Sequence, residues 1–283
     1  MSTEHTARLA CIQWDVQLGD LAANIDLATR LVEEAAADGA QLVVLPEMWG
    51  TSFMAEAADS VRGRIAGADE ALAQLSARLR LIAVGSNYEF ADDGKVYNRA
   101  RIWQDGTLLG DYRKIHLFSP LGEDRHFAGG TAPLVVDTRL GRIAVATCYD
   151  LRFPELTRFL YLEGAEVLVL PSQWPEARAL HWRVLTRARA IENQMFVVAT
   201  NRCGFETMAA TGQEVGYPGN SVIVDPTGEI RAKGNGEEGH VMAEVDLKEA
   251  QIVRRAIPIG KDRRPDVYED IWDKYLRSRV RAQ

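Results

Sequence analysis

Cysteine is scarce in this sequence, and long apolar runs are missing from it. The 283 residues include three cysteines, Cys11, Cys148 and Cys203, and none of them lies in a Cys-x-x-Cys pair. Such a sparse and odd set predicts neither a disulfide framework nor a zinc site. No apolar run approaches the ~20 residues that a membrane-spanning helix needs, and the first residues show no basic stretch followed by an apolar segment. We therefore expect a cytoplasmic protein without a membrane partner.

Basic residues are also fewer than acidic residues in this sequence. Lysine and arginine total 33 residues against 40 aspartates and glutamates, so the formal net charge is −7, and the isoelectric point of the sequence is about 5.4. This balance argues against nucleic acid or an anionic membrane as the main partner. The overall composition, with 47% hydrophobic and 26% charged residues, is typical of a globular chain that buries a core.

No segment rich in proline, glycine and serine divides the chain. Helical and strand patterns alternate along it, which is typical of layered α/β folds. We predict one domain over residues 1–283, with a core over about 7–268 and a C-terminal tail over 269–283. Within the core, the patterns predict helices over 21–40, 69–80, 154–164 and 181–193, strands over 8–16, 41–47, 81–90, 96–104, 107–118, 166–173 and 195–203, and a hairpin over 220–233.

One stretch of the sequence is echoed later in the chain. The segments GAQLVVLPE (39–47) and GAEVLVLPS (164–172) each place Gly-Ala and an apolar strand before Leu-Pro. Each pattern predicts a helix end followed by a buried strand. Two such units favour a two-layer sheet with pseudo-twofold halves. Glu47 and Ser172 would then lie at equivalent strand ends, where α/β folds build their sites.

Cys148 lies where an apolar strand stops, in the stretch RIAVATCYDLRFPEL. It is either a small side chain that packs in the core at the end of a buried strand or a nucleophile presented at the tip of the strand. A nucleophilic thiol needs a proton acceptor and is favoured by a nearby positive charge. Among the five histidines, His116 and His181 are the candidate acceptors, although the helical setting of His181 favours a packing or surface role. Cys11 and Cys203 are expected to be small buried residues.

A carboxylate is the alternative acceptor. Glu47 directly follows the apolar run LVVLP and precedes Met48, Trp49 and Phe53, so partial burial should raise its pKa into a useful range. Lys114, in YRKIHLF, is a candidate for the positive charge that would stabilise a thiolate and then an oxyanion. A solvated loop position stays an open alternative for Glu47 and for Lys114.

Three motifs, in this order, resemble those of the nitrilase superfamily of carbon–nitrogen hydrolases. They are LVVLPEMW, YRKIHLF and CYDLRFPEL, and the resemblance extends from RLACIQWD to about GKDRRPDVY, nearly the whole chain. It implies an α/β fold, a four-layer αββα sandwich that dimerises into an αββα–αββα block. It also implies a small amide as substrate and no metal or organic cofactor.

The resemblance further implies roles for individual residues. Glu47 matches the general base, Lys114 the cation that stabilises the oxyanion and Cys148 the nucleophile, which together form a Glu-Lys-Cys triad. Glu123, in FSPLGEDRHF, matches a second glutamate of the family, although Asp124 is adjacent to it. A histidine is not required in this chemistry.

Three aromatic residues are predicted to contact the substrate. Tyr149 follows the nucleophile, and its backbone N–H is the expected second donor to the oxyanion. Phe118 ends the lysine motif, and Trp174 follows the echoed strand, with core packing as its alternative. Arg152 and Glu155 are expected to form an ion pair that fixes the turn after the nucleophile.

The substrate has to be inferred from longer segments. CYDLRFPEL, PSQWPEARALHWRVLTRARAIENQMFVVATNR and GNSVIVDPTGEI look most like the ω-amidase branch, whose members release ammonia from keto-acid amides such as 2-oxoglutaramate and 2-oxosuccinamate. An extended loop over 205–220 leaves hydrolysis of an N-carbamoyl amine or amino acid as the alternative. A catalytically silent binding module on the same fold is the alternative from another class. Against it stands the joint presence of Glu47, Lys114 and Cys148.

Overall fold

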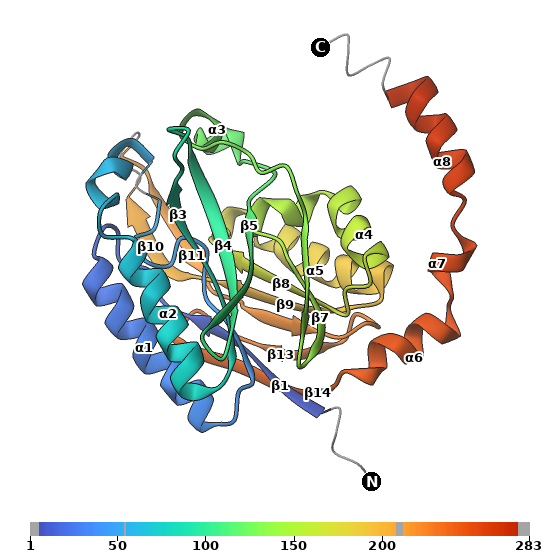
Figure 1. Cartoon of the computed structure of the whole chain (residues 1–283), viewed down its shortest axis with the longest axis horizontal. Coiled ribbons are helices and arrows are strands. Elements are labelled where there is room, and N and C mark those ends of the chain that lie inside the picture. Colours follow the sequence, from blue (N-terminus) through green and yellow to red (C-terminus); the bar gives the residue numbers. More distant parts are fainter. Residues whose placement is uncertain (1–5, 54, 208–211, 277–283) are drawn as a thin grey trace.

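Two mixed sheets lie face to face in the molecule, with helices on their outer sides (Figure 1). The computed structural model describes residues 6–53, 55–207 and 212–276. The first sheet has the order β14-β1-β2-β3-β4-β5, with β1 (Thr6–Gln13), β2 (Leu42–Val44), β3 (Ile82–Phe90), β4 (Val96–Gln104), β5 (Thr107–Arg113) and β14 (Gly239–Asp246). The second has the order β13-β12-β9-β8-β7-β6, with β6 (Leu134–Thr138), β7 (Gly141–Val145), β8 (Val167–Ser172), β9 (Phe196–Asn201), β12 (Val222–Val224) and β13 (Ile230–Lys233).

The two sheets share one internal plan. In the first sheet β1, β2 and β3 are parallel, whereas β14, β4 and β5 run antiparallel to their neighbours. In the second sheet β7, β8 and β9 are parallel, whereas β6, β12 and β13 run antiparallel to theirs. The strands of the echoed segments, β2 and β8, occupy equivalent central places. The predicted pseudo-twofold halves are therefore confirmed in the strand order.

Alternate strand residues form the core between the sheets. Leu42 and Val44 of β2 belong to it together with Val169 of β8, whereas Val43 belongs to the core beneath the helices. This alternation follows from the twofold side-chain period of a strand. The hydroxyl of Thr200 donates to the Val44 carbonyl at 2.9 Å, which joins one sheet directly to the other.

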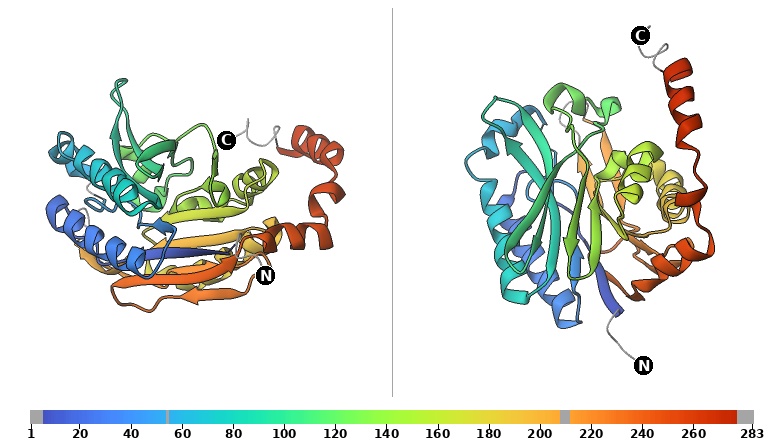
Figure 2. Two further views of the ribbon diagram at one scale, coloured as in Figure 1. Left: turned by 60° about the horizontal axis from the view of Figure 1, so that its bottom comes forward. Right: turned by 45° about the vertical axis from the view of Figure 1, so that its right-hand side comes forward.

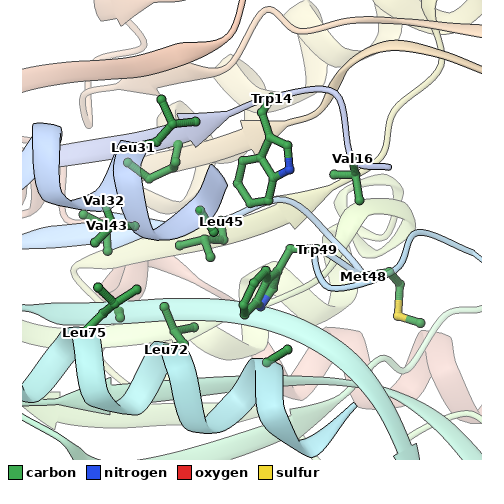
Figure 3. Packing of buried hydrophobic residues seen from close by; sticks show 14 of the residues in the cluster. Trp14, Val16, Leu31, Val32, Val43, Leu45, Met48, Trp49, Leu72 and Leu75 are labelled. Carbon is green, nitrogen blue, oxygen red and sulfur yellow. The ribbon is translucent and has the colours of Figure 1, made fainter. Parts of the chain in front are cut away.

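Two helices cover the outer face of each sheet. Figure 3 shows Leu31 and Leu72, from the two helices on the first sheet, packed with Trp14 and Trp49. The order of layers is thus helix, sheet, sheet, helix, and the predicted αββα sandwich is confirmed. The covering helices are α1 (Leu21–Ala37) and α2 (Ala66–Leu79) on the first sheet, and α4 (Pro154–Leu162) and α5 (Ala179–Asn193) on the second.

Shorter elements complete the chain. Figure 2 shows the C-terminal helices along the side of the molecule that α4 and α5 occupy. Of the predicted tail over 269–283, residues 277–283 lie outside the described part. The short elements are the helices α3 (Glu123–His126), α6 (Lys248–Ala256), α7 (Ile259–Asp262) and α8 (Pro265–Ile271), the 3-10 turns Ala55–Val61, Ser119–Leu121, Cys148–Arg152 and Glu176–Arg178, and a π-helical turn, Trp272–Leu276. Among the described residues, no helix combines the length and apolar character that crossing a bilayer requires.

Some predicted boundaries were wrong. The strand predicted over 41–47 is only three residues long, because Pro46 has no N–H to continue the ladder. The strand predicted over 107–118 ends at Arg113, where the chain turns to bury the next side chain. The extended loop over 205–220 contains a two-stranded hairpin of β10 (Cys203–Thr207) and β11 (Glu214–Pro218), and its residues 208–211 lie outside the described part.

Candidate active site

Cys148 lies just beyond the end of β7, at the start of a 3-10 turn. Its backbone φ is +44°, a left-handed value that is costly for a residue with a side chain. The residue is 8% exposed and lines a cavity, and its sulfur lies 3.8 Å from the carbonyl oxygen of Gln173. This geometry matches presentation at a strand tip.

Glu47 is completely buried. Its Oε1 accepts hydrogen bonds from Lys114 Nζ at 2.8 Å and from Asn98 Nδ2 at 2.7 Å. Its Oε2 accepts the backbone N–H of Gln173 at 3.1 Å, and its carboxyl group lies close enough to Cys148 for its charge to raise the pKa of the thiol. The alternative of a solvated loop carboxylate is therefore excluded for Glu47.

Lys114 lies between two carboxylates. Its Nζ is 2.8 Å from Glu47 Oε1 and 2.9 and 2.8 Å from the two oxygens of Glu123. Lys114 is 2% exposed and Glu123 is 6% exposed, whereas Asp124 is exposed. Glu123 also accepts the Phe118 N–H at 2.6 Å, which orients its carboxylate. The structure thus brings Glu123, rather than its neighbour, to the lysine.

Burial and mutual charge set the protonation of this cluster. Burial raises the pKa of Glu47, and the charge of Glu123 adds to this effect, while Lys114 opposes it. Burial disfavours the ammonium of Lys114, but Glu47 and Glu123 outweigh burial and raise its pKa. Burial and Glu47 together raise the pKa of Cys148 well above its usual range. The resting thiol is therefore protonated and needs a base at the moment of attack.

The two histidines considered as acceptors do not line this cavity. His116 Nδ1 lies 2.8 Å from Asp150 Oδ1, and its ring stacks on Phe153 at 3.6 Å. His181 Nδ1 lies 3.1 Å from a guanidinium nitrogen of Arg152. Among the three candidate proton acceptors, Glu47 is the one that lines the cavity together with Cys148.

The cavity in front of Cys148 is small and is lined by aromatic and charged residues. Its volume is about 100 Å³, well below the roughly 300–1,000 Å³ of sites for drug-sized ligands. The three aromatic residues predicted to contact substrate, Phe118, Tyr149 and Trp174, all line it. Trp174 also belongs to the core beneath α4 and α5, so it packs in the core as well as lining the cavity, and its contact with substrate stays a prediction. Phe53, Phe127 and Tyr217 complete the aromatic wall.

Two arginines also line the cavity. The guanidinium of Arg152 lies over the ring of Trp174 at 4.6 Å and contacts His181, so the predicted ion pair with Glu155 was wrong. Glu155 is exposed at the start of α4. The guanidinium of Arg178 lies over the ring of Phe118 at 5.2 Å. Neither arginine has a carboxylate partner among the described residues.

Sequence reasoning missed a buried polar network behind Glu47. The side-chain amide of Gln173 donates to the Glu47 carbonyl at 2.7 Å, and its Oε1 accepts from Ser52 at 3.1 Å and from Arg202 at 3.2 Å. Arg202 also pairs with Glu206, at 2.6 Å, and Glu206 lines the cavity. One sequence signal indicated this network: the repeated segment GAEVLVLPS ends at Ser172, and Gln173 is the next residue.

The two other cysteines lie apart from this cavity. Burial raises the pKa of Cys11 to about 12 and that of Cys203 to about 12, as expected for small buried residues. Within the described ranges, no group of three or more histidine, cysteine, aspartate or glutamate side chains could hold a metal ion.

Known proteins are similar in sequence to this chain over most of its length. The family model described as carbon-nitrogen hydrolase matches residues 8–255. The chain is 34% identical to the 2-oxoglutaramate amidase of Bacillus subtilis (strain 168) over 92% of this chain and 98% of that protein. It is 35% identical to the omega-amidase NIT2-A of Xenopus laevis over 87% of this chain and 91% of that protein.

A solved structure agrees with the sequence relatives. Nit3 of Saccharomyces cerevisiae, a member of branch 10 of the nitrilase superfamily, superposes with a TM-score of 0.81 at 28% identity, over 91% of this chain and 97% of Nit3. The family model spans all three motifs. The chain therefore belongs to the carbon–nitrogen hydrolase family of the nitrilase superfamily.

Proposed function

We propose that this chain is an ω-amidase, which hydrolyses the terminal amide of a small α-keto dicarboxylate monoamide such as 2-oxoglutaramate or 2-oxosuccinamate. One observation carries the proposal. The Glu47–Lys114–Cys148 cluster opens into a cavity of about 100 Å³, which is also lined by two arginines that have no carboxylate partner in the part of the chain that the structure describes. The names of the relatives, 2-oxoglutaramate amidase and omega-amidase, support the same substrate class.

The first half of the reaction forms a thioester. The sulfur of Cys148 bonds to the amide carbon while its proton passes to Glu47, which lines the same cavity. The carbonyl electron pair moves to oxygen, where Lys114 and the backbone N–H of Tyr149 stabilise the negative charge. Loss of one such donor typically raises the barrier by about 3–4 kcal/mol. Glu47 returns the proton to the nitrogen, the C–N bond breaks, and ammonia leaves.

The second half removes the acyl group. Water adds to the thioester carbon while Glu47 accepts one of its protons. The C–S bond then breaks, the proton returns to the sulfur, and the dicarboxylic acid leaves. Glu123 holds Lys114 through both of its oxygens, so the ammonium stays in place through both halves.

Arg152 and Arg178 would hold the other end of the substrate. A guanidinium binds a carboxylate through two parallel hydrogen bonds, and burial strengthens that attraction. Burial lowers the pKa of Arg152, which indicates that its charge is partly stripped of water. The keto-acid carboxylate would therefore be drawn to this side of the cavity and leave the amide in front of Cys148.

One residue of the cavity, Glu206, is compatible with a second substrate class, the N-carbamoyl diamines. The carboxylate of Glu206 lines the cavity and would suit the cationic end of an N-carbamoyl diamine. However, the charge of Glu206 is already matched by Arg202 at 2.6 Å. Arg152 and Arg178, which also line the cavity, favour an anionic substrate over a cationic one.

We also propose that the protein is a homodimer. Large apolar side chains on the outer sides of α4 and α5 are exposed, which marks an interaction surface. A twofold dimer would bring the same patch of both copies together, as the family resemblance implies. The exposed residues are Phe159, Leu162, Leu180, Val184 and Ile191.

The test is ammonia release from a panel of 2-oxoglutaramate, glutamine, an N-carbamoyl amino acid, an N-carbamoyl diamine and a simple nitrile. We expect turnover of the keto-acid amide, loss of it in Cys148→Ala and full retention in Cys11→Ala, the matched buried control. Activity on a carbamoyl compound alone would overturn the substrate class and keep the nucleophile. No activity on any compound, with Cys148 no more reactive than Cys11, would favour a binding module.

A further inference from the structure

Asp150 is a completely buried carboxylate that lies outside the catalytic cluster. Its Oδ2 accepts the backbone N–H of Thr147 at 2.9 Å, and its own N–H donates to the Thr147 carbonyl at 3.0 Å. These reciprocal bonds close the turn on both sides of Cys148 and Tyr149. The turn they close holds the left-handed backbone of Cys148 and the Tyr149 N–H assigned to the oxyanion.

The same carboxylate also binds the segment that carries Lys114. Asp150 Oδ2 accepts the hydroxyl of Tyr112 at 2.7 Å, and Oδ1 accepts the backbone N–H and the ring Nδ1 of His116 at 3.0 and 2.8 Å. The Tyr112 hydroxyl in turn accepts the N–H of Ile115 at 3.2 Å. Both backbone amides that follow Lys114 are thereby tied to one carboxylate.

Lys114 and Cys148 belong to different sheets, because Lys114 follows β5 and Cys148 follows β7. Asp150 joins the two chain segments through three bonds to one segment and one to the other, all between 2.7 and 3.0 Å. A shift of about 1 Å between reacting groups can cost about 100-fold in rate.

We propose that Asp150 is a positioning residue that fixes the ammonium of Lys114 against the sulfur of Cys148 and the Tyr149 N–H. It acts through Thr147, Tyr112 and His116 and does not contact substrate. The inference rests on the proposed roles of Lys114 and Cys148, but not on the identity of the substrate. It predicts that Asp150 affects the chemical step more than the binding of substrate.

The test uses Asp150→Asn and the milder Tyr112→Phe, with the Cys148 alkylation rate by iodoacetamide at pH 7 as a readout that needs no substrate. We expect alkylation to slow about 10-fold in Asp150→Asn and less in Tyr112→Phe, which removes one bond of the network. With 2-oxoglutaramate, kcat should fall about 100-fold while KM changes less than threefold. Asp225→Asn is the matched control, because this buried carboxylate serves a remote turn at the β12–β13 hairpin.

A double-mutant cycle separates positioning from general stabilisation. If Asp150 acts through Lys114, then Asp150→Asn added to Lys114→Ala should slow alkylation less than twofold further, because the ammonium it positions is gone. A full additional 10-fold effect in that background would overturn the inference, as would unchanged alkylation and kcat in a folded Asp150→Asn.

The substrate proposal and this inference fail in different ways. Slower alkylation in Asp150→Asn, in an enzyme that never turns over the keto-acid amide, would support the positioning role and overturn only the substrate. If Asp150→Asn does not fold, Tyr112→Phe decides: an alkylation rate equal to that of the parent chain would overturn the inference.

Discussion

Gln173 holds Glu47 at two points. Its backbone N–H donates to the carboxylate Oε2 at 3.1 Å, and its side-chain amide donates to the Glu47 carbonyl at 2.7 Å. One residue therefore fixes both the backbone and the carboxylate of the proposed base. Because Gln173 follows β8 and Glu47 follows β2, these two hydrogen bonds also connect the second sheet to the first.

Truncation of this side chain should weaken catalysis without abolishing it. In Gln173→Ala we expect kcat to fall about 10-fold, because Glu47 keeps its bonds to Lys114 and Asn98 and to the backbone N–H. The free energy of unfolding should fall by about 1–3 kcal/mol, since the Glu47 carbonyl and Arg202 lose a buried partner. Steady-state kinetics and urea unfolding check the two effects. A kcat equal to that of the parent chain would contradict this account of the network.

The acid limb of the pH profile should report Glu47. Burial and the charge of Glu123 raise the pKa of Glu47 above its ordinary value of about 4.3, and the base must be ionised to accept a proton. Activity should therefore rise with pH through this raised pKa. Glu123→Gln removes one of the causes, so its acid limb in kcat/KM should move to lower pH. Asp124→Asn, at the exposed neighbour, is the control and should leave the limb in place.

The arginines should govern substrate affinity rather than the chemical step. In Arg152→Met and Arg178→Met we expect KM for 2-oxoglutaramate to rise about 10- to 100-fold, because a charged hydrogen bond typically contributes about 1.5–3 kcal/mol. Hydrolysis of propionamide, which has no carboxylate, should change little. Arg183→Met, at an exposed arginine of α5, is the matched control. Equal losses on both amides would show that the arginines do not select for charge.

A charge on the exposed side of α5 should dissociate the proposed dimer. Val184 is 55% exposed and lies among apolar neighbours on this helix, so Val184→Glu would place a carboxylate at the centre of the interface. We expect light scattering to give the mass of one chain for the variant and twice that for the parent. A parent chain that is already monomeric would overturn the dimer proposal.

The sequence predicted the layers because apolar periodicity reports burial directly. Leu42, Val43 and Val44 are buried on both faces of β2, and such continuous apolar runs are typical of central parallel strands. Glu47 could be singled out from sequence because it follows a buried strand and precedes Met48 and Trp49, whereas Lys114 was assigned a role through the resemblance of its motif to the family. The cytoplasmic location and the single-domain boundaries stay predictions.

The rest of the site could not be predicted in this way. Asn98 comes from within β4, two strands away from β2 in the same sheet, and Glu206 comes from the β10–β11 hairpin, so only the tertiary fold brings them to the cavity that Glu47 lines. Arg152 was assigned to Glu155 because ion pairs four or fewer residues apart are common, but the aromatic rings of Tyr149 and Trp174 hold its guanidinium instead. Such contacts depend on tertiary geometry, about which local spacing carries no information.

The matching strand order of the two sheets has a consequence for folding. The first half of the chain supplies the acid–base carboxylate and the ammonium, and the second half supplies the sulfur and the arginines, so neither half alone contains a working centre. An intermediate with both sheets formed but not yet docked would have nearly full secondary structure and no turnover. Recovery of activity during refolding therefore reports the docking of the two halves, and it should lag behind the recovery of far-ultraviolet circular dichroism.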